Sequence, residues 1–410
     1  MKRTMLEPLG SIIIILLFPI LLSQSLAFAF SNSYVTIASS GTIRETTGMA
    51  IKFVVAYSLT TSAPESLVQH VAQFDLVIID FSSCGLASRI KAINPKAIVI
   101  AYSSIMSMHT SYSDWNEVNS HEDWFLHDVN GNRIRAVNGF NGWYGMDVGN
   151  LGWREHFANR LKALLETYPD LDGMFADNAW DGFAYGVWNV PKEQLPADIG
   201  SRWHNDMLGM ISYVKGTIGS KLFIVNTSND DDYVDACDGK MWEGWVHASW
   251  YSFDQFISEY YWKPYVDDSL EHVSRRGKYY LALSGTKIPQ DPTESDREKT
   301  RAIMMYCFCS YLLGVNGTKA TFGFNFIDSN DGSLGYYPEF DEARALGSPT
   351  GYFYQFGSVY ARDFNNGKVL VNPGTSSLTV DLGGEYKTLD GQIVSNVTLD
   401  AHSGIILLKT

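Results

Sequence analysis

Short apolar runs alternate with amphipathic segments along most of this chain. The runs are rich in β-branched and aromatic residues, and apolar residues recur at helical spacing in the segments between them. This alternation predicts repeated strand–helix units and therefore a parallel sheet. We predict eight strands, at residues 52–57, 76–81, 97–102, 173–177, 222–226, 240–243, 279–284 and 321–325.

The clearest helix precedes the fourth predicted strand. One face of it carries Trp153, Phe157, Leu161, Leu164, Leu165 and Tyr168, and Pro169 marks its end. Amphipathic segments at 203–218 and 301–313 precede the fifth and eighth strands. This order predicts an α/β fold, a (β/α)8 TIM barrel spanning 50–348. A doubly wound sheet is the alternative, but no Gly-rich phosphate-binding loop follows the first strand.

The pattern changes after residue 351. Short apolar strands separated by Asn-Gly, Pro-Gly and Gly-Gly turn signals replace the helical periodicity. These strands are predicted at 359–362, 368–372, 377–381, 386–389 and 405–409. They indicate a small antiparallel, β-sandwich-like domain over 351–410, for which we favour a structural role over carbohydrate binding.

Polar residues stand at the carboxyl ends of six predicted strands. They are Asp80, Tyr102, Asp177, Asn226, Glu243 and Asn325. In a parallel barrel these strand ends open onto the loops that build the active site. Taken alone, Asp177 could equally cap a helix or close a turn, and Glu243 could form a structural salt bridge. The recurrence of polar residues at the same end of successive strands favours a common site.

Two of these carboxyl groups suit the cleavage of a glycosidic bond. Such cleavage uses one ionised and one protonated carboxyl group on opposite sides of the bond. Glu243 lies between Trp242 and Trp245, whose rings could exclude water and raise its pKa. We therefore predict Asp177 and Glu243 as the catalytic pair. We expect substrate hydroxyls and sugar rings to contact Asp80, Tyr102, Asp147, Asn178, Trp180, Asp181, Asn226 and Trp242.

Three short motifs carry a family resemblance. The runs 123–132 (DWFLHDVNGN), 146–150 (MDVGN) with Trp153 and Arg154, and 175–181 (FADNAWD) resemble the hypothetical glycosyl-hydrolase-like group of TIM-barrel proteins. The resemblance spans roughly 54–323 and implies a barrel that hydrolyses glycosidic bonds. The placement of the two acids is similar to that in the α-galactosidase-type clan, which implies Asp177 as nucleophile and Glu243 as acid/base. That clan usually has Asp in the second position, so the division of roles stays open.

No motif for a metal or a cofactor is present. The sequence lacks HExxH, GxSxG, a P-loop and a Cys-x-x-Cys pair, so we expect neither group. The spacing of Asp128, Asn130 and Asn132 is similar to that of a calcium loop, but Arg133 stands where such a loop needs Gly. A turn is the favoured interpretation. A formal net charge of −14 argues against nucleic acid as a partner.

The first 29 residues are typical of a secretion signal. Lys2 and Arg3 precede an apolar run at 12–22, and Ala27 and Ala29 form a small-residue cleavage site. We expect a secreted protein, with an uncleaved membrane anchor as the alternative. Export would permit disulfides, and Cys84 with Cys237 is the possible pair. Cys307 and Cys309 are too close in a predicted helix to pair with each other.

These observations predict a secreted glycoside hydrolase that acts on a poly- or oligosaccharide through two carboxyl groups. A catalytically inactive barrel that binds carbohydrate at the cell surface is the main alternative, because one fold supports many functions. An isomerase or lyase on the same scaffold is a weaker one.

Overall fold

The computed structural model describes most of the chain after residue 51. The described residues are 52–137, 140–182, 188, 194–227, 231–248, 250–270, 272, 276–315, 319–327 and 332–410. The predicted secretion signal at 1–29 lies outside them.

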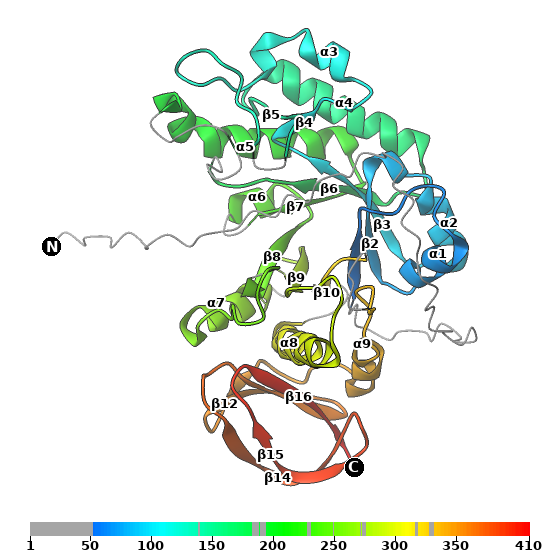
Figure 1. Ribbon diagram of the computed structural model, residues 1–410, viewed down its shortest axis with the longest axis vertical. Coiled ribbons are helices and arrows are strands. Elements are labelled where there is room, and N and C mark those ends of the chain that lie inside the picture. The colour runs from blue at the N-terminus through cyan, green and yellow to red at the C-terminus, as the bar shows by residue number, and fades with distance from the viewer. Residues whose placement is uncertain are drawn as a thin grey trace, which may run out of the picture.

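Eight parallel strands form a barrel at the centre of the molecule (Figure 1). Hydrogen bonding follows the order β1-β2-β3-β6-β7-β8-β9-β10, and a parallel bridge between Lys52 and Phe322 joins the first strand to the last. The strands are β1 (Phe53–Ala56), β2 (Leu76–Asp80), β3 (Ile98–Ser104), β6 (Gly173–Asp177), β7 (Leu222–Asn226), β8 (Gly239–Ala248), β9 (Tyr279–Gly285) and β10 (Ala320–Phe324). Each lies at a predicted position, so the (β/α)8 prediction is confirmed.

Helices connect successive strands and cover the outside of the barrel (Figure 1). Among the described residues they are α1 (Glu65–Val71), α2 (Leu86–Ile93), α4 (Leu151–Thr167), α5 (Ala197–Ile218), α6 (Asp231–Asp235), α7 (Glu259–Leu270), α8 (Glu294–Gly314) and α9 (Glu339–Glu342). The Asn150 side chain caps α4 by accepting a hydrogen bond from the Trp153 backbone at 3.1 Å. Thr293 and Asp296 form a capping box at the start of α8.

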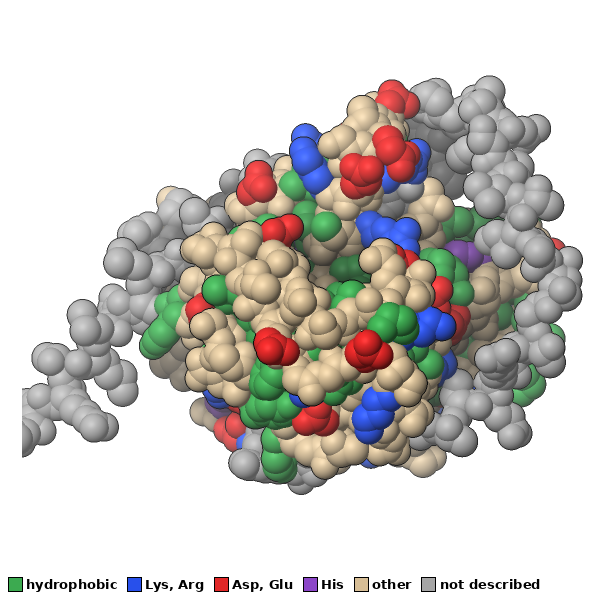
Figure 2. Space-filling view, turned by 90° about the horizontal axis from the view of Figure 1, so that it is seen from below, with side chains coloured by type: hydrophobic (Ala, Val, Ile, Leu, Met, Phe, Trp, Pro, Cys, Tyr) green, Lys and Arg blue, Asp and Glu red, His purple; other side chains and the backbone are tan. Residues whose placement is uncertain are grey.

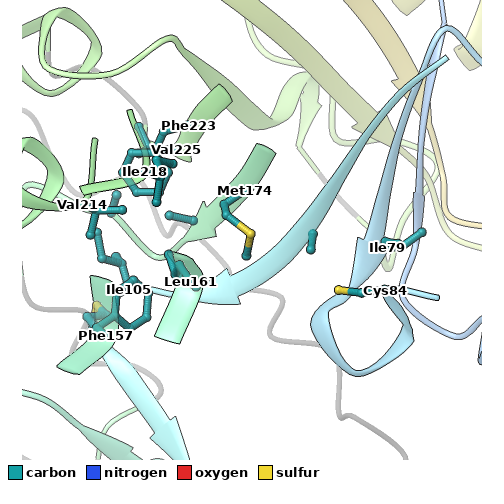
Figure 3. Close-up of a cluster of buried hydrophobic side chains, with 14 of the residues drawn as sticks. Ile79, Cys84, Ile105, Phe157, Leu161, Met174, Val214, Ile218, Phe223 and Val225 are labelled. Atoms are coloured by element: carbon teal, nitrogen blue, oxygen red, sulfur yellow. The ribbon is translucent and has the colours of Figure 1, made fainter. Parts of the chain in front are cut away.

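The alternation of side chains along the strands separates two apolar layers. In β7, Phe223 and Val225 face the helices, whereas Ile224 faces the barrel interior with residues of the other strands. Figure 3 shows part of the outer layer, where side chains of α4 and α5 meet those of β6 and β7. Residues in phase with the inner layer therefore face the barrel mouth when they stand at a strand's carboxyl end.

The connection from β3 to α4 contains its own small structure. Strands β4 (Ser107–His109) and β5 (Trp143–Gly145) pair antiparallel, and the short helix α3 (Trp115–Asn119) lies between them in sequence. Asp128 closes a turn within this connection by accepting bonds from the backbone of Asn130 and Asn132, both at 2.8 Å. This is the turn expected in place of a calcium loop.

The C-terminal residues form one six-stranded antiparallel sheet that curls in Figure 1. Its strands are β11 (Tyr354–Phe356), β12 (Val359–Phe364), β13 (Gly367–Asn372), β14 (Leu378–Thr388), β15 (Ile393–Leu399) and β16 (Ser403–Lys409). The predicted strands 377–381 and 386–389 are halves of β14, whose register shifts between Asp381 and Tyr386. The Gly-Gly pair that suggested a turn lies in this irregular stretch.

This small domain packs on α8. Val369 and Ile406 join the apolar cluster that contains Phe308 of that helix. Gly404 makes the close approach possible, because a Cβ atom there would overlap Cys309. Figure 2 views the molecule from below Figure 1, where the domain lies, and shows acidic, basic and apolar side chains mixed on that face.

All four cysteines are free and buried. Cys84 follows the carboxyl end of β2, whereas Cys237 precedes the amino end of β8. The two thiols therefore lie at opposite ends of the parallel barrel, and the suggested Cys84–Cys237 pair does not form. Within the described part of the chain, no helix has the length and apolarity needed to cross a membrane.

Candidate active site

The carboxyl ends of three barrel strands have unusual backbone conformations. Asn178, Val246 and Asn325 have positive φ angles of 63°, 49° and 57°; Asn178 and Asn325 directly follow β6 and β10, and Val246 lies among the last three residues of β8. Non-glycine residues rarely adopt such angles, and the surrounding structure must maintain them. Their concentration at one end of the barrel marks that end as the candidate site.

Asp177, Asn226 and Glu243 form a hydrogen-bonded group at this end. They stand on the neighbouring strands β6, β7 and β8, in phase with the inner residues Phe175, Ile224 and Met241 of the same strands. Asn226 Nδ2 donates to Asp177 Oδ1 and to Glu243 Oε2, each at 2.9 Å. One amide thus holds the two predicted catalytic carboxyl groups next to each other.

Asp177 accepts hydrogen bonds on both of its oxygens. Tyr102 donates its hydroxyl to Oδ2 at 2.9 Å, and the Asn178 backbone donates to Oδ1 at 2.8 Å. The Asn178 side chain adds a bond to Oδ2 at 3.1 Å. Burial raises the pKa of Asp177, and the donors from Asn226, Tyr102 and Asn178 oppose that rise by stabilising the ionised form.

Glu243 has less support for its charge. Among the described residues its carboxyl group accepts one hydrogen bond, that from Asn226. Burial and the nearby charge of Asp177 raise its pKa to about 8, and the Asn226 bond only partly opposes them. The site therefore contains one carboxyl group equipped to be ionised and one equipped to keep its proton at neutral pH.

Asp80 and Tyr57 complete the ring of polar groups around this pair. Asp80 accepts from the Ser82 backbone and hydroxyl at 2.8 and 2.5 Å, and burial raises the pKa of its carboxyl group. Tyr57 was not among the residues predicted for the site, although it ends the first predicted strand. The centroid of the Tyr57 ring lies 4.5 Å from that of the Tyr102 ring. Burial raises the pKa of the Tyr57 phenol well above 10.0, and the nearby carboxyl groups of Asp177, Glu243 and Asp80 add to this rise.

Three residues predicted to contact the substrate have protein partners in this structure. Asp147 forms an ion pair with Arg202 of α5, with contacts of 2.8 and 3.1 Å. Asp181 accepts from His204 of the same helix at 2.8 Å. Trp180 donates its indole N–H to Asn178 at 3.3 Å and packs partly against the outer apolar layer. Asp147 and Asp181 therefore position loops against α5.

The position of Trp242 differs from the prediction that it contacts the substrate. It follows Met241, which faces the interior, so its own side chain points to the helices. It is buried there, with its ring 4.2 Å from that of Tyr265 in α7. Trp245 is buried in the same outer layer. The two indoles therefore do not flank Glu243, and Trp242 cannot stack on a sugar bound at the barrel mouth.

Different aromatic residues reach the mouth. Tyr57 and Trp250 pack against the inner cluster, which contains Tyr102 and Phe326. The signal for Tyr57 was its phase with Phe53 and Val55 along β1. Trp250 carried no such signal, because it follows the end of β8 in a loop.

One cluster of potential metal ligands exists among the described residues, at Asp231, Asp268 and His272. Basic side chains of the protein already form ion pairs with the carboxylates of this cluster. Lys240 lies 2.8 Å from Asp268, and Arg276 lies 2.7 Å from Asp231. This arrangement is a network of ion pairs, and nothing in it calls for a metal.

Comparison with known proteins agrees with this architecture. Residues 91–368 match hypothetical glycosyl hydrolase family 15. None of the curated proteins matches the chain. A similar fold occurs in the Ttha1563 protein of Thermus thermophilus, with a TM-score of 0.51 and 11% identity over 90% of this chain and 94% of that one. An alpha-amylase of Lactobacillus plantarum has a TM-score of 0.50 and 10% identity over 88% of this chain and 99% of that one.

A third similar structure is the glycoside hydrolase domain of PelA from Pseudomonas aeruginosa (TM-score 0.43, 12% identity, 67% of this chain and 99% of that one). At such identities the first two structures bear on the fold alone. The family match covers more than half of the chain, and it includes both Asp177 and Glu243. The chain therefore belongs to hypothetical glycosyl hydrolase family 15, which makes it a glycoside hydrolase.

Proposed function

We propose that this protein is a secreted hydrolase that cleaves O-glycosidic bonds of a poly- or oligosaccharide with Asp177 and Glu243. The observation that carries the proposal is the shared donor, Asn226 Nδ2, at 2.9 Å from an oxygen of each carboxyl group. This contact holds two groups of opposite protonation preference beside one another, which is the requirement for general acid catalysis next to an ionised nucleophile.

The closeness of the pair favours retention of anomeric configuration. Asp177 Oδ1 and Glu243 Oε2 each lie 2.9 Å from Asn226 Nδ2, so the separation of these two oxygens cannot exceed twice that distance. Retaining glycosidases place their carboxyl groups about 5–5.5 Å apart, whereas inverting enzymes leave about 6.5–9.5 Å for a water molecule. The limit on this oxygen–oxygen separation is nearer to the retaining class, so we expect direct attack by the carboxylate of Asp177.

The different surroundings of the two groups divide their roles. Glu243, with a pKa raised to about 8, protonates the leaving oxygen as the glycosidic bond breaks. Asp177, supported by four donor contacts, attacks the anomeric carbon and forms a glycosyl ester. Glu243, now ionised, takes a proton from water, whose oxygen attacks that carbon and releases Asp177. Each cycle consumes one water and returns both groups to their starting states.

The remaining polar groups at the mouth suit a neutral, hydroxyl-rich ligand. In the described part of the chain, Oδ2 of Asp80 and the hydroxyl of Tyr57 have no hydrogen-bond partner, so both are free to contact sugar hydroxyls. The charge of −14 disfavours a nucleic-acid substrate. The charged, apolar and small-residue segments at 1–29 support export to a compartment where polysaccharides occur.

The test is the release of reducing sugar from a broad polysaccharide panel. Wild type is compared with the isosteric variants Asp177→Asn and Glu243→Gln, and circular dichroism checks their folding. Asp181→Asn is the matched control, because Asp181 is exposed and pairs with His204.

We expect release by wild type and by Asp181→Asn, and a loss of at least about a thousandfold in the two site variants. Folded site variants that work at the wild-type rate would overturn the proposal. Binding without any release by wild type would favour an inactive carbohydrate-binding barrel instead.

A further inference from the structure

Trp250 lies directly on Gly285. Strand β9 ends at Gly285, and a Cβ atom there would overlap the six-membered ring of Trp250. No larger residue than glycine can stand beneath the ring without displacing it. The φ angle of Gly285 is not positive, so the glycine serves this close approach rather than the backbone conformation.

Gly285 faces the barrel mouth. Along β9, Leu281 and Leu283 belong to the inner cluster, and Gly285 follows them in the same phase. The register places Glu243 beside Leu283 and Ala248 beside Gly285. The Trp250 ring therefore lies at the mouth, one inward-facing position above the level of Glu243.

The other contacts of Trp250 fix the orientation of its ring. Its centroid lies 4.8 Å from that of Phe326, at an interplanar angle of 40°. Phe326 in turn lies 6.5 Å from Tyr57. Trp250 remains partly exposed even though Gly285 and Phe326 support it. An aromatic ring that is fixed by its neighbours and still partly exposed can stack on the C–H face of a sugar.

We propose that Trp250 is the stacking platform for the sugar on the leaving-group side of the cleaved bond, and that Gly285 is the positioning residue for this ring. The proposal rests on the proposed catalytic roles of Asp177 and Glu243. Trp250 thereby takes the stacking role predicted for Trp242, which does not reach the barrel mouth.

The order of the strands assigns the side. Asp177, Asn226, Glu243 and Gly285 stand on the successive strands β6, β7, β8 and β9. Trp250 thus lies on the opposite side of Glu243 from Asp177. Since Glu243 contacts the oxygen between the two sugars and Asp177 contacts the anomeric carbon, the sugar beyond Glu243 is the one that leaves.

The test compares two substrates of the same sugar in the intact enzyme. One is a polysaccharide that wild type cleaves, and the other is the corresponding glycosyl fluoride, which has no leaving-group sugar. Trp250→Ala removes the platform, Trp250→Phe retains a flat ring, and Gly285→Ala displaces the ring. Gly216→Ala is the matched control, because a Cβ atom there would meet no atom within 4 Å.

We expect kcat/KM on the polysaccharide to fall by about tenfold or more in Trp250→Ala and in Gly285→Ala. Activity on the fluoride should stay near wild type in both, and Trp250→Phe should recover most of the polysaccharide activity. Wild-type polysaccharide activity in Trp250→Ala would overturn the proposal, and so would an equal loss on the fluoride, which would place the ring at the other sugar.

Binding gives a readout that needs no turnover. Calorimetric titration of the polysaccharide into Asp177→Asn is compared with the Asp177→Asn/Trp250→Ala double variant, and we expect weaker binding by the latter. Equal binding would overturn the platform even if the catalytic roles stand. Failure of wild type to cleave any substrate would instead count against the proposed function.

Discussion

Asp177 and Glu243 accept hydrogen bonds from the same atom, Nδ2 of Asn226, at 2.9 Å each. The shared donor reduces the repulsion between two buried carboxyl groups that stand on strands separated only by β7. It also fixes the orientation of the two groups relative to each other.

Replacing Asn226 with Ala should shift the pH dependence of catalysis. The amide lowers the pKa of both carboxyl groups, so its loss raises both values. We expect both limbs of the kcat/KM profile to move to higher pH, and kcat to fall about tenfold to a hundredfold. Unmoved limbs in a folded Asn226→Ala variant would show that this amide does not tune the pair.

The wild-type profile should be bell-shaped. The proposed mechanism requires an ionised Asp177, whose pKa is raised above 3.8, and a protonated Glu243, whose pKa is about 8. The rate should therefore be lost as pH falls through the first value and again as it rises through the second. An activated substrate that needs no protonation of its leaving group should abolish the alkaline limb. Persistence of that limb would assign it to another group.

Glu243 should make the fold less stable as pH rises. Its pKa is about 8 in the folded protein against a usual 4.5, so stability is fully present below pH 4.5 and declines through pH 8. The loss is at most about 5 kcal/mol, at about 1.4 kcal/mol per pH unit. Urea unfolding should show Glu243→Gln to be more stable than wild type at pH 8, with the difference vanishing near pH 4. A constant difference would contradict the raised pKa.

Arg362 should be a major contributor to stability and not to catalysis. Its guanidinium is buried in β12 and donates to the carbonyls of Leu312, Leu313 and Val315, at 3.1, 2.8 and 2.6 Å. These carbonyls end α8, and Arg362→Met would leave them without a charged donor. We expect unfolding free energy to fall by about 2–5 kcal/mol, with KM unchanged at temperatures where the variant is folded.

Arg89→Met provides the control for this prediction. Arg89 pairs with exposed Glu65 at 2.9 Å, and such pairs contribute about 1 kcal/mol or less. Equal effects of the two substitutions would contradict the role of Arg362 in joining the C-terminal domain to α8.

Trp242→Phe tests the corrected position of that residue. Because Trp242 packs against Tyr265 in the outer layer, the smaller ring should lower unfolding free energy by about 1–3 kcal/mol. Affinity for the polysaccharide should stay within about threefold of wild type. A larger loss of affinity in the folded variant would return Trp242 to the substrate cleft.

The barrel could be predicted because its strands are short apolar runs between amphipathic helices, and this pattern is local. The strand-end residues Asp177, Asn226 and Glu243 followed from it, since parallel strands bring their carboxyl ends together. The phase of the side chains along each strand carries further information about the site. It separates Trp242 from Glu243 along β8, and it would have identified Tyr57 at the end of β1.

Residues in loops could not be placed in this way. Asp147 and Asp181 pair with Arg202 and His204 of α5, and those contacts depend on how two connections fold over one helix. Trp250 reaches the mouth because its loop folds back over Gly285, a contact between residues 35 positions apart. Tertiary packing determines these positions, and no periodicity in the sequence encodes it.

The most direct test of the account is to trap the nucleophile. Wild-type enzyme is incubated with a panel of activated 2-fluoro glycosides, and peptide mapping by mass spectrometry locates any covalent sugar. We predict a single adduct on Asp177, which also forms in Glu243→Gln because the activated leaving group needs no proton, and which is absent from Asp177→Asn. Turnover of natural substrate by an enzyme that acquires its label on another residue, or on none, would contradict the central claim.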